Sequence, residues 1–485
     1  MRKSQEMSIF NAPHKKTHNS YASTQSYWQF LSEISTFFKK DNAENAMYFI
    51  MDVIKGVKMT EKVLFGRKSR CNKVYSLLQT FQCLLLYPCF MIRNPYNFER
   101  TALGRHLSCG KDVFYRFMND PDINGRKMLY HINRQLWKKT MARSDRRGAT
   151  TCLMIDDTDL PKTGKRMENI GRVHSHLEHR SILGYKALCL GITDGVSQML
   201  LDFALLGEKG KKGDFGMSSK EFKGRFSHNR DVDSPLRERL DEYTMKKTDL
   251  TIEMVKRAIR HGVRFRYLLA DSWFTCSAIV RFIASRHIGC DYLGMIKIGE
   301  DCRTKYHFER RDLNAPSLIR RLDKRGGKKY SRKLRCWYIA VDVRFAGVPV
   351  RLFFIRRSKH GSWSGLLTTD MKLDFFEAYR IYAQRWSLEV VFKEAKGLLG
   401  LEKCLSNDFA AQIASTSLVC MQYNILSLVK RFHAYETMGE LFRLANQYAH
   451  ELTITERIWG ALLEIVTAIS GIFGCNDQYV LNALV

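Results

Sequence analysis

Several features that mark common classes of protein are missing from this chain of 485 residues. Its 13 cysteines include no C-x2-C pair, which argues against a zinc ribbon or a Cys-rich knuckle. Their odd number and their scatter among apolar residues fit reduced thiols in a cytosol. The segment Met1–Ser20 is polar and has no apolar signal core. We therefore expect a cytoplasmic protein.

Long uninterrupted hydrophobic runs are also missing. The most apolar window, Val74–Ile92, contains Gln79, Gln82 and Pro88. Polar and helix-breaking residues inside so short a run favour a buried helix over a membrane span. We expect no membrane partner.

Negative charge is scarce: the chain has 79 Lys and Arg residues but only 49 Asp and Glu residues, which gives a formal net charge of +30. Between Arg303 and Lys359 there are 18 basic residues against 4 acidic ones, a net of +14, so nearly half of the excess lies in one segment. Such a concentration favours a polyanionic partner, and nucleic acid fits better than a membrane surface because no amphipathic anchor carries the charge.

Composition indicates a globular protein with two or three domains, because 45% of the residues are hydrophobic and 12% are aromatic. The pattern of apolar residues and loops predicts six segments: a mobile N-terminus (1–24), a helical DNA-binding region (25–143), the first part of a catalytic core (150–296), a basic β-rich insertion (297–370), the closing helix of the core (371–405) and a helical C-terminal region (406–485).

One part of the N-terminal region has helix-turn-helix spacing. A predicted helix, Asn97–Leu107, is followed by the Gly-containing turn Ser108–Lys111 and by a second helix, Asp112–Met118. Any pair of antiparallel helices gives a similar pattern, so DNA binding by this segment is one of two interpretations.

The region after it alternates strands and helices. An unbroken apolar strand, Thr151–Ile155, is predicted to be covered on both faces and to end in Asp156. Asp194-Gly195 then marks a hairpin between strands Tyr185–Thr193 and Gln198–Leu206. The remaining predicted elements are helix Leu236–His261, strand Arg266–Ala270 followed by Asp271, helix Thr275–Ser285 and strand Asp291–Ile296. This order is that of a ribonuclease H-like α/β core with a mixed sheet.

The basic segment contains two further strands, Leu334–Phe345 and Val348–Arg356, joined at Ala346-Gly347. Strands that meet at a glycine turn predict an antiparallel insertion in the core. Trp337 and Trp363 lie in this insertion, where each could stack on a nucleobase or be buried in a small core.

A Pro-free run, Leu373–Lys396, is predicted to form one helix. Relative to Tyr382, the residues Arg385, Glu389 and Lys396 stand at +3, +7 and +14, which places them on one stripe about 60° wide. A carboxylate, two cations and a phenol on one stripe suit a metal ion and a phosphate backbone. A solvated face with ion pairs produces the same pattern.

The spacing Tyr-x2-Arg-x3-Glu-x6-Lys resembles the signature of transposases of the insertion sequence four family, a branch of the DDE recombinases. The resemblance implies that Glu389 is the third catalytic acid, and that Tyr382, Arg385 and Lys396 contact transposon-end DNA. It extends in order and spacing from Thr151 to Leu405, including a β-rich insertion between the second and third acids. Relatives use an aromatic residue of the insertion to hold a flipped base. The resemblance makes Trp337 a candidate DNA contact of this kind, with Trp363 as the alternative.

Three acids are the candidate catalytic residues and metal ligands: Asp156, Asp271 and Glu389. Two Mg2+ ions (or Mn2+) held by carboxylates can activate an oxygen nucleophile and stabilise a leaving oxygen at phosphorus. An acid at a strand end is more often a cap or turn residue. Asp157 and Asp159 compete with Asp156 for the first position. The resemblance selects Asp156, because the family pattern is an apolar strand followed by Asp, one variable residue and a hydroxyl residue, here Thr158. Strand alternation also places Asp157 on the opposite face.

Together these observations predict a cut-and-paste DNA transposase of the bacterial cytoplasm and nucleoid. It would bind the terminal inverted repeats of its element, cleave them with metal ions, and join the freed ends to target DNA. The resemblance also implies a homodimer in a paired-end complex. Two alternatives remain open: a structure-selective nuclease with the same core, and a non-catalytic DNA-binding protein derived from a transposon.

Overall fold

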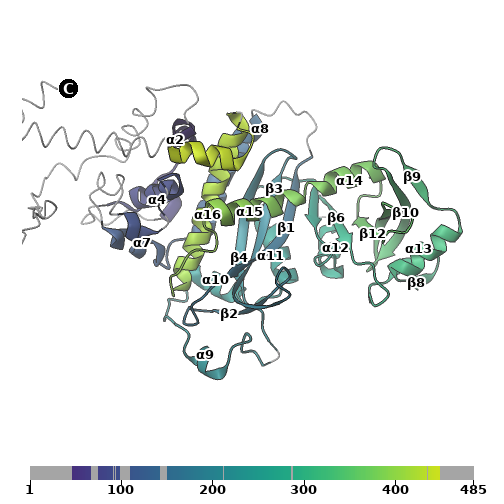
Figure 1. Ribbon diagram of the computed structural model, residues 1–485, viewed down its shortest axis with the longest axis horizontal. Helices are drawn as coiled ribbons and strands as arrows, with labels where there is room; N and C mark the ends of the chain where they lie inside the picture. The colour runs from purple at the N-terminus through teal and green to yellow at the C-terminus, as the bar shows by residue number, and fades with distance from the viewer. Residues whose placement is uncertain are drawn as a thin grey trace, which may run out of the picture.

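The computed structural model describes residues 46–66, 75–90, 92, 94–98, 110–142, 150–210, 212–285, 288–433 and 435–447. Within these ranges the chain forms one long mixed sheet with helices packed against it (Figure 1). Parts of the expectations above lie outside the described residues: the mobile N-terminus, most of the first helix of the helix-turn-helix pattern, and the end of the C-terminal region.

The strands that precede the insertion form one half of the sheet. They are β1 (Cys152–Pro161), β2 (Gly171–Ser175), β3 (Arg180–Thr193), β4 (Gln198–Leu206), β5 (Tyr267–Ala270) and β6 (Asp291–Ile296). β3 runs antiparallel to β1, β2 and β4, whereas β1, β5 and β6 run parallel to one another. The predicted hairpin between β3 and β4 is confirmed, and Gly195 has the positive φ of 86° that its turn requires.

β1 is longer than the sequence indicates. Cys152–Ile155 is fully buried as predicted, but the strand continues to Pro161 because β3 pairs with it along its whole length. Asp156 therefore lies within the strand, opposite Cys189, and not after its end. The side chains of a strand alternate between its two faces, so this extension fixes the faces of the acids that follow.

Helices cover the sheet between β4 and β6: α9 (Ser219–Lys223), α10 (Pro235–Glu242), α11 (Lys247–Arg260) and α12 (Ser277–Ile283). The prediction of one helix over Leu236–His261 is wrong, because the chain turns between α10 and α11. α10 begins with Ser234 as a side-chain cap and Pro235 in the first turn, a common start for a helix.

The insertion contains β7 (Tyr306–Phe308), β8 (Arg311–Leu313), α13 (Ala315–Lys324), β9 (Lys329–Ser331), β10 (Cys336–Phe345), β11 (Val348–Arg356) and β12 (Ser364–Thr368). The predicted antiparallel pairing of β10 with β11 is confirmed, and Ala346 and Gly347 both have positive φ, as a tight hairpin turn requires. β12 pairs antiparallel with β6, so the strands of the insertion belong to the same sheet as the strands before it (Figure 1).

The helices that precede the sheet are α2 (Ala46–Gly56), α3 (Glu61–Phe65), α4 (Leu77–Leu86), the 3-10 helix η2 (Tyr87–Phe90), α5 (Pro95–Phe98), α7 (Lys111–Met118) and α8 (Gly125–Ala142). The helix α16 (Phe409–Phe432) packs between them and β4 (Figure 1). Most of its side chains are buried. Among the described residues, no helix combines the length and the apolar character that crossing a membrane requires.

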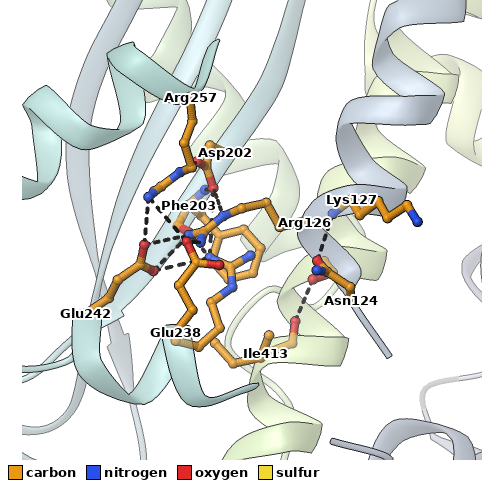
Figure 2. A network of polar contacts seen from close by, with 11 residues as sticks. Asn124, Arg126, Lys127, Asp202, Phe203, Glu238, Glu242, Arg257 and Ile413 are labelled. Carbon is orange, nitrogen blue, oxygen red and sulfur yellow. Dashed lines mark hydrogen bonds and ion pairs between the residues drawn. The ribbon is translucent and has the colours of Figure 1, made fainter. Parts of the chain in front are cut away.

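A buried network of charges fastens α8 to the sheet (Figure 2). Arg126 of α8 forms ion pairs with Asp202 of β4 at 2.9 Å and with Glu242 of α10 at 2.7 Å. Arg257 of α11 contacts the same two acids at 2.8 and 3.0 Å, and Arg239 lies against them. Burial alone would raise the pKa of Asp202, but the three arginines hold it below its usual range.

Candidate active site

The predicted helix over Leu373–Lys396 is two helices, α14 (Phe375–Ala383) and α15 (Trp386–Leu398). Between them the backbone N–H of Arg385 donates to Tyr382 O, and that of Leu388 donates to Arg385 O, each at 3.0 Å. These bonds span three residues where an α-helix spans four, so the turn is tighter and the phase of the helix changes. The predicted single helix is therefore interrupted, with Tyr382 on α14 and Glu389 on α15. Arg385 still lies beside the ring of Tyr382 and donates to Glu389.

Asp156 and Asp271 come from neighbouring parallel strands. Ile155 of β1 is in register with Ala270 of β5, so the next residue on each strand is one of the two acids. The negative charge of Asp271 contributes to raising the pKa of Asp156, which indicates their proximity. The structure thus brings the first two predicted acids side by side, just beyond the point where the pairing of β1 with β5 ends.

Glu389 is connected to Asp156 through an arginine. The Arg385 Nη1 donates to Asp156 Oδ2 at 2.8 Å, and its Nη2 donates to Glu389 Oε1 at 2.5 Å. α15 packs against β1, so both carboxylates face the same guanidinium. The side chains of Arg385 and Asp156 are 13% and 16% exposed, whereas that of Glu389 is 34% exposed. The third acid is therefore the most accessible to solvent of these groups.

Asp271 is held differently. Its Oδ1 accepts hydrogen bonds from the backbone N–H groups of Trp273 at 2.8 Å and Phe274 at 3.3 Å. Within the described part of the chain it forms no ion pair. The local turn fixes the orientation of this carboxylate without supplying a full positive charge.

Burial raises the pKa of Asp156 to about 7. Arg385 and the backbone N–H of Asp157 oppose that shift, while the charges of Asp271 and Asp157 add to it. A carboxylate whose burial outweighs its hydrogen bonds is short of positive charge.

The neighbouring acids of β1 point away from α15. Asp157 forms an ion pair with Lys247 of α11, and Asp159 forms one with Lys186 of β3 at 2.7 Å. This alternation follows from the period of two along a strand. Of the acids on β1, Asp156 is the one paired with the arginine that also binds Glu389.

The other predicted DNA contacts are engaged within the protein. Tyr382 lies beside Arg385, 6.0 Å from its ring centroid to the guanidinium carbon, and Lys396 donates to Asp159 O at 2.6 Å. Trp337 is half-buried in the insertion, with the ring of Tyr330 at 4.9 Å. The negative charges of Asp271 and Asp156 contribute to raising the pKa of Tyr382 after burial, the larger cause, so Tyr382 lies beside these acids. The printed contacts of Lys396 and Trp337 are with other residues.

Two exposed tryptophans beside the acids were missed by the sequence analysis. Trp273 follows Asp271 by two residues and is 41% exposed, with Lys247 Nζ 4.8 Å from its ring centroid. Trp386 precedes Glu389 by three residues and is 62% exposed. The only available signal was a large aromatic residue next to each acid motif, which periodicity cannot distinguish from a core residue.

The donor set is chemically suited to Mg2+, because carboxylate oxygens are the hard ligands that this ion prefers. As the side chains lie, the described residues contain no group of three or more His, Cys, Asp or Glu positioned to hold an ion. Arg385 takes one oxygen of Asp156 and one of Glu389. The acids fit the ion by type and by strand position, and a side-chain rearrangement must precede joint coordination.

Residues 91–299 match the family model described as DDE superfamily endonuclease. This segment contains Asp156 and Asp271 and ends before Glu389. No curated protein matches the chain. A solved structure, the cryo-EM structure of a piggyBac transposase synaptic complex with hairpin DNA, is similar with a TM-score of 0.40 at 13% identity. The similarity covers 88% of this chain and 81% of that one.

Proposed function

We propose that this protein is a DDE-type DNA transposase of the insertion sequence four kind, with Asp156, Asp271 and Glu389 as its catalytic acids. The observation that carries the proposal is the placement of Asp156 and Asp271 at adjacent positions of parallel strands, with Arg385 linking Asp156 to Glu389. The match of residues 91–299 to the DDE superfamily endonuclease model supports the same reaction class.

The strand arrangement supports a ribonuclease H-like core. Its order across the sheet is β4-β3-β1-β5-β6, with the first three strands antiparallel and the last three parallel. Asp156 and Asp271 follow the segments over which the parallel strands β1 and β5 pair, and ligands bind beyond the carboxyl ends of such strands in open α/β sheets. In the sequence, the insertion separates these strands from the helix that carries Glu389.

Asp156, Asp271 and Glu389 would hold two Mg2+ or Mn2+ ions, which when bound polarise the scissile phosphate and lower the pKa of an attacking water. Asp271 would contribute a carboxylate already oriented by two backbone N–H groups. Glu389 would contribute one from a helix surface, where 34% exposure leaves it free to change rotamer. Asp156 would supply a largely buried ligand fixed by the strand.

DNA binding would use the basic insertion and the residues around the acids. Most basic side chains of the insertion are exposed, among them Lys329, Arg332, Lys333 and Arg335. Contacts between such residues and phosphates release counterions and give affinity that falls with salt. Tyr382, Arg385, Lys396 and Trp337 would contact the element's terminal inverted repeats, and the resemblance implies a homodimer that pairs two ends and then attacks target DNA.

The test is cleavage by the purified full chain of DNA carrying the gene's own flanking ends, in Mg2+ and in EDTA. We expect a break at a defined end with Mg2+, and its loss in Glu389→Gln while DNA binding persists. Glu377→Gln is a matched control, because Glu377 lies on the surface of α14 paired with Arg380. Glu389→Gln cleaving as well as wild type would overturn the assignment.

Two other outcomes would favour the alternatives. Metal-dependent cleavage that depends on DNA structure and ignores the end sequence would point to a structure-selective nuclease. Tight binding of the ends by wild type with no cleavage in either metal would point to a non-catalytic protein derived from a transposon.

A further inference from the structure

Arg385 occupies the space between two of the proposed metal ligands. Each of its two Nη atoms donates to a different carboxylate, Asp156 or Glu389. Its Nε is buried and has no hydrogen-bond partner in the structure. Both terminal nitrogens of Arg385 are used by these acids, while a third donor is buried without a partner. A buried unpaired donor costs free energy, so another arrangement of this side chain could be more favourable.

We propose that Arg385 is an internal counter-ion of the acids that must leave before they bind metal, and that a DNA phosphate draws it away. Binding of DNA would thereby raise the affinity of the site for a divalent ion. The inference rests on the proposed function, and it concerns the order in which DNA and metal assemble there.

Arg385 cannot clear the site by losing its proton, because a guanidinium stays charged in proteins. A divalent ion placed on the oxygens of Asp156 and Glu389 would stand within a few ångströms of that charge, in a site where only 13–34% of these side chains is exposed. Repulsion between like charges is strong where water is largely excluded. The ion and the guanidinium therefore compete for the same oxygens, and the side chain of Arg385 must move away before the ion can bind them.

A DNA phosphate is a suitable acceptor for the displaced side chain. Arginine binds phosphate through two parallel hydrogen bonds to one group. Each of the two carboxylates that Arg385 now contacts accepts only one of its hydrogen bonds. Arg385 stands at the tight turn between α14 and α15, directly before the 62% exposed Trp386. The adjoining position in the chain is thus at the protein surface, and Glu389, one of the two acids that Arg385 binds, is 34% exposed.

The charge of the surroundings also favours release in the presence of metal. Asp157 and Asp159 have cations of their own, Lys247 and Lys186, and do not need Arg385. Asp271 stands beside Asp156 without an ion pair among the described residues. Divalent ions would supply more positive charge to Asp156, Asp271 and Glu389 than one guanidinium does.

The test is Mn2+ binding by the full chain, measured from the electron paramagnetic resonance signal of free Mn2+, with and without end DNA. Titration of the DNA alone gives the baseline to subtract. For wild type we expect DNA to tighten Mn2+ binding by about tenfold or more, within the range of coupling between two ligand sites. For Arg385→Gln we expect tight Mn2+ binding without DNA, and little further effect of DNA.

Lys247→Met is the matched control, since it removes a cation that pairs with Asp157 and leaves Arg385, Asp156 and Glu389 in place. Its Mn2+ affinity should stay within a factor of about two of wild type, and its response to DNA should be retained. If Arg385→Gln does not fold, Arg385→Lys keeps the charge but not the two-pronged contact, and it should show an intermediate DNA effect.

Unchanged or weaker Mn2+ binding by Arg385→Gln without DNA would overturn the inference. If wild type still cleaves ends with metal in that case, only the role of Arg385 as a counter-ion is lost. If neither protein binds Mn2+ in any condition and neither cleaves, the proposed function fails together with it.

Discussion

Arginines meet carboxylates in two regions of this molecule, and the regions differ in burial and in charge balance. In the network of Figure 2, Arg126, Arg239 and Arg257 surround the buried Asp202 and Glu242. In the candidate active site a single arginine, Arg385, pairs with Asp156 and Glu389. The pKa of Asp202 is accordingly lowered and that of Asp156 is raised to about 7. A carboxylate surrounded by arginines is a structural element, whereas one short of positive charge can still accept a ligand.

The largest effect should come from breaking the buried network. Arg126→Met would leave Asp202 and Glu242 with less positive charge in a site where Asp202 is 0% exposed. We expect the free energy of unfolding to fall by about 3–5 kcal/mol, as for other buried pairs that lose one partner. Urea unfolding followed by circular dichroism measures it. Glu238→Gln is the control, because Glu238 is 54% exposed and should cost about 1 kcal/mol or less.

A substitution in the candidate active site should lower cleavage activity and leave the free energy of unfolding nearly unchanged. Asp271→Asn keeps an oxygen that can accept from the N–H groups of Trp273 and Phe274 but removes the charge. Loss of metal stabilisation worth several kcal/mol corresponds to a fall in cleavage of about a hundredfold or more. Asp249→Asn, an exposed change on α11, should cleave normally. A stability loss equal to that of Arg126→Met would contradict the contrast between the two regions.

The pH dependence of the free energy of unfolding should reflect the lowered pKa of Asp202. Its pKa is lower in the folded protein than in the unfolded chain, so its stabilising contribution is present above pH about 4 and is lost as pH falls through the folded value. Asp202→Asn should therefore be less stable than wild type at pH 7, and the gap should narrow below pH about 4. Urea midpoints from pH 7 to pH 3 test this; a gap that widens on acidification would be the wrong sign.

The smallest effect should come from the pair on the other face of β1. Lys247 and Asp157 are each 16% exposed, and Lys247→Met removes one charge while keeping a similar stem. We expect a loss of about 1–3 kcal/mol in unfolding free energy, between the values for exposed and for fully buried pairs, and cleavage close to that of wild type. A thermal melt together with the end-cleavage assay would decide it. Loss of cleavage here would mean that Asp157, and not Asp156, belongs to the active site.

Much of the sheet could be predicted because its strands are short apolar runs with clear turns. β4, β6 and β11 have the predicted bounds, and Gly195 and Gly347 stand at the turns that the sequence marked. β2 was missed because Gly171–Ser175 is too polar to stand out; it pairs with the extended end of β3. Its pairing partner, and not its own composition, makes it a strand.

The candidate site was harder to predict, because its contacts join distant parts of the chain. The spacing of Tyr382 and Glu389 indicated one helix, but the tight turn at Arg385 is a backbone effect without a Gly or Pro signal. That Arg385 binds Asp156, 229 residues away in sequence, follows only from the packing of α15 on β1. The face of Asp156 relative to Asp157, in contrast, followed from strand alternation alone.

The pairing of β12 with β6 makes the insertion mechanically inseparable from the acids. β6 pairs with β5, and Asp271 directly follows β5, so a continuous ladder of backbone hydrogen bonds leads from the insertion to the residue before Asp271. If the insertion tilted, the paired strands would move with it and would shift Asp271, because no flexible linker lies between them. Deleting residues 297–370 would also leave β6 as an uncovered edge strand, ready to pair with another chain. A truncated protein of this kind should aggregate before it can be tested for nuclease activity.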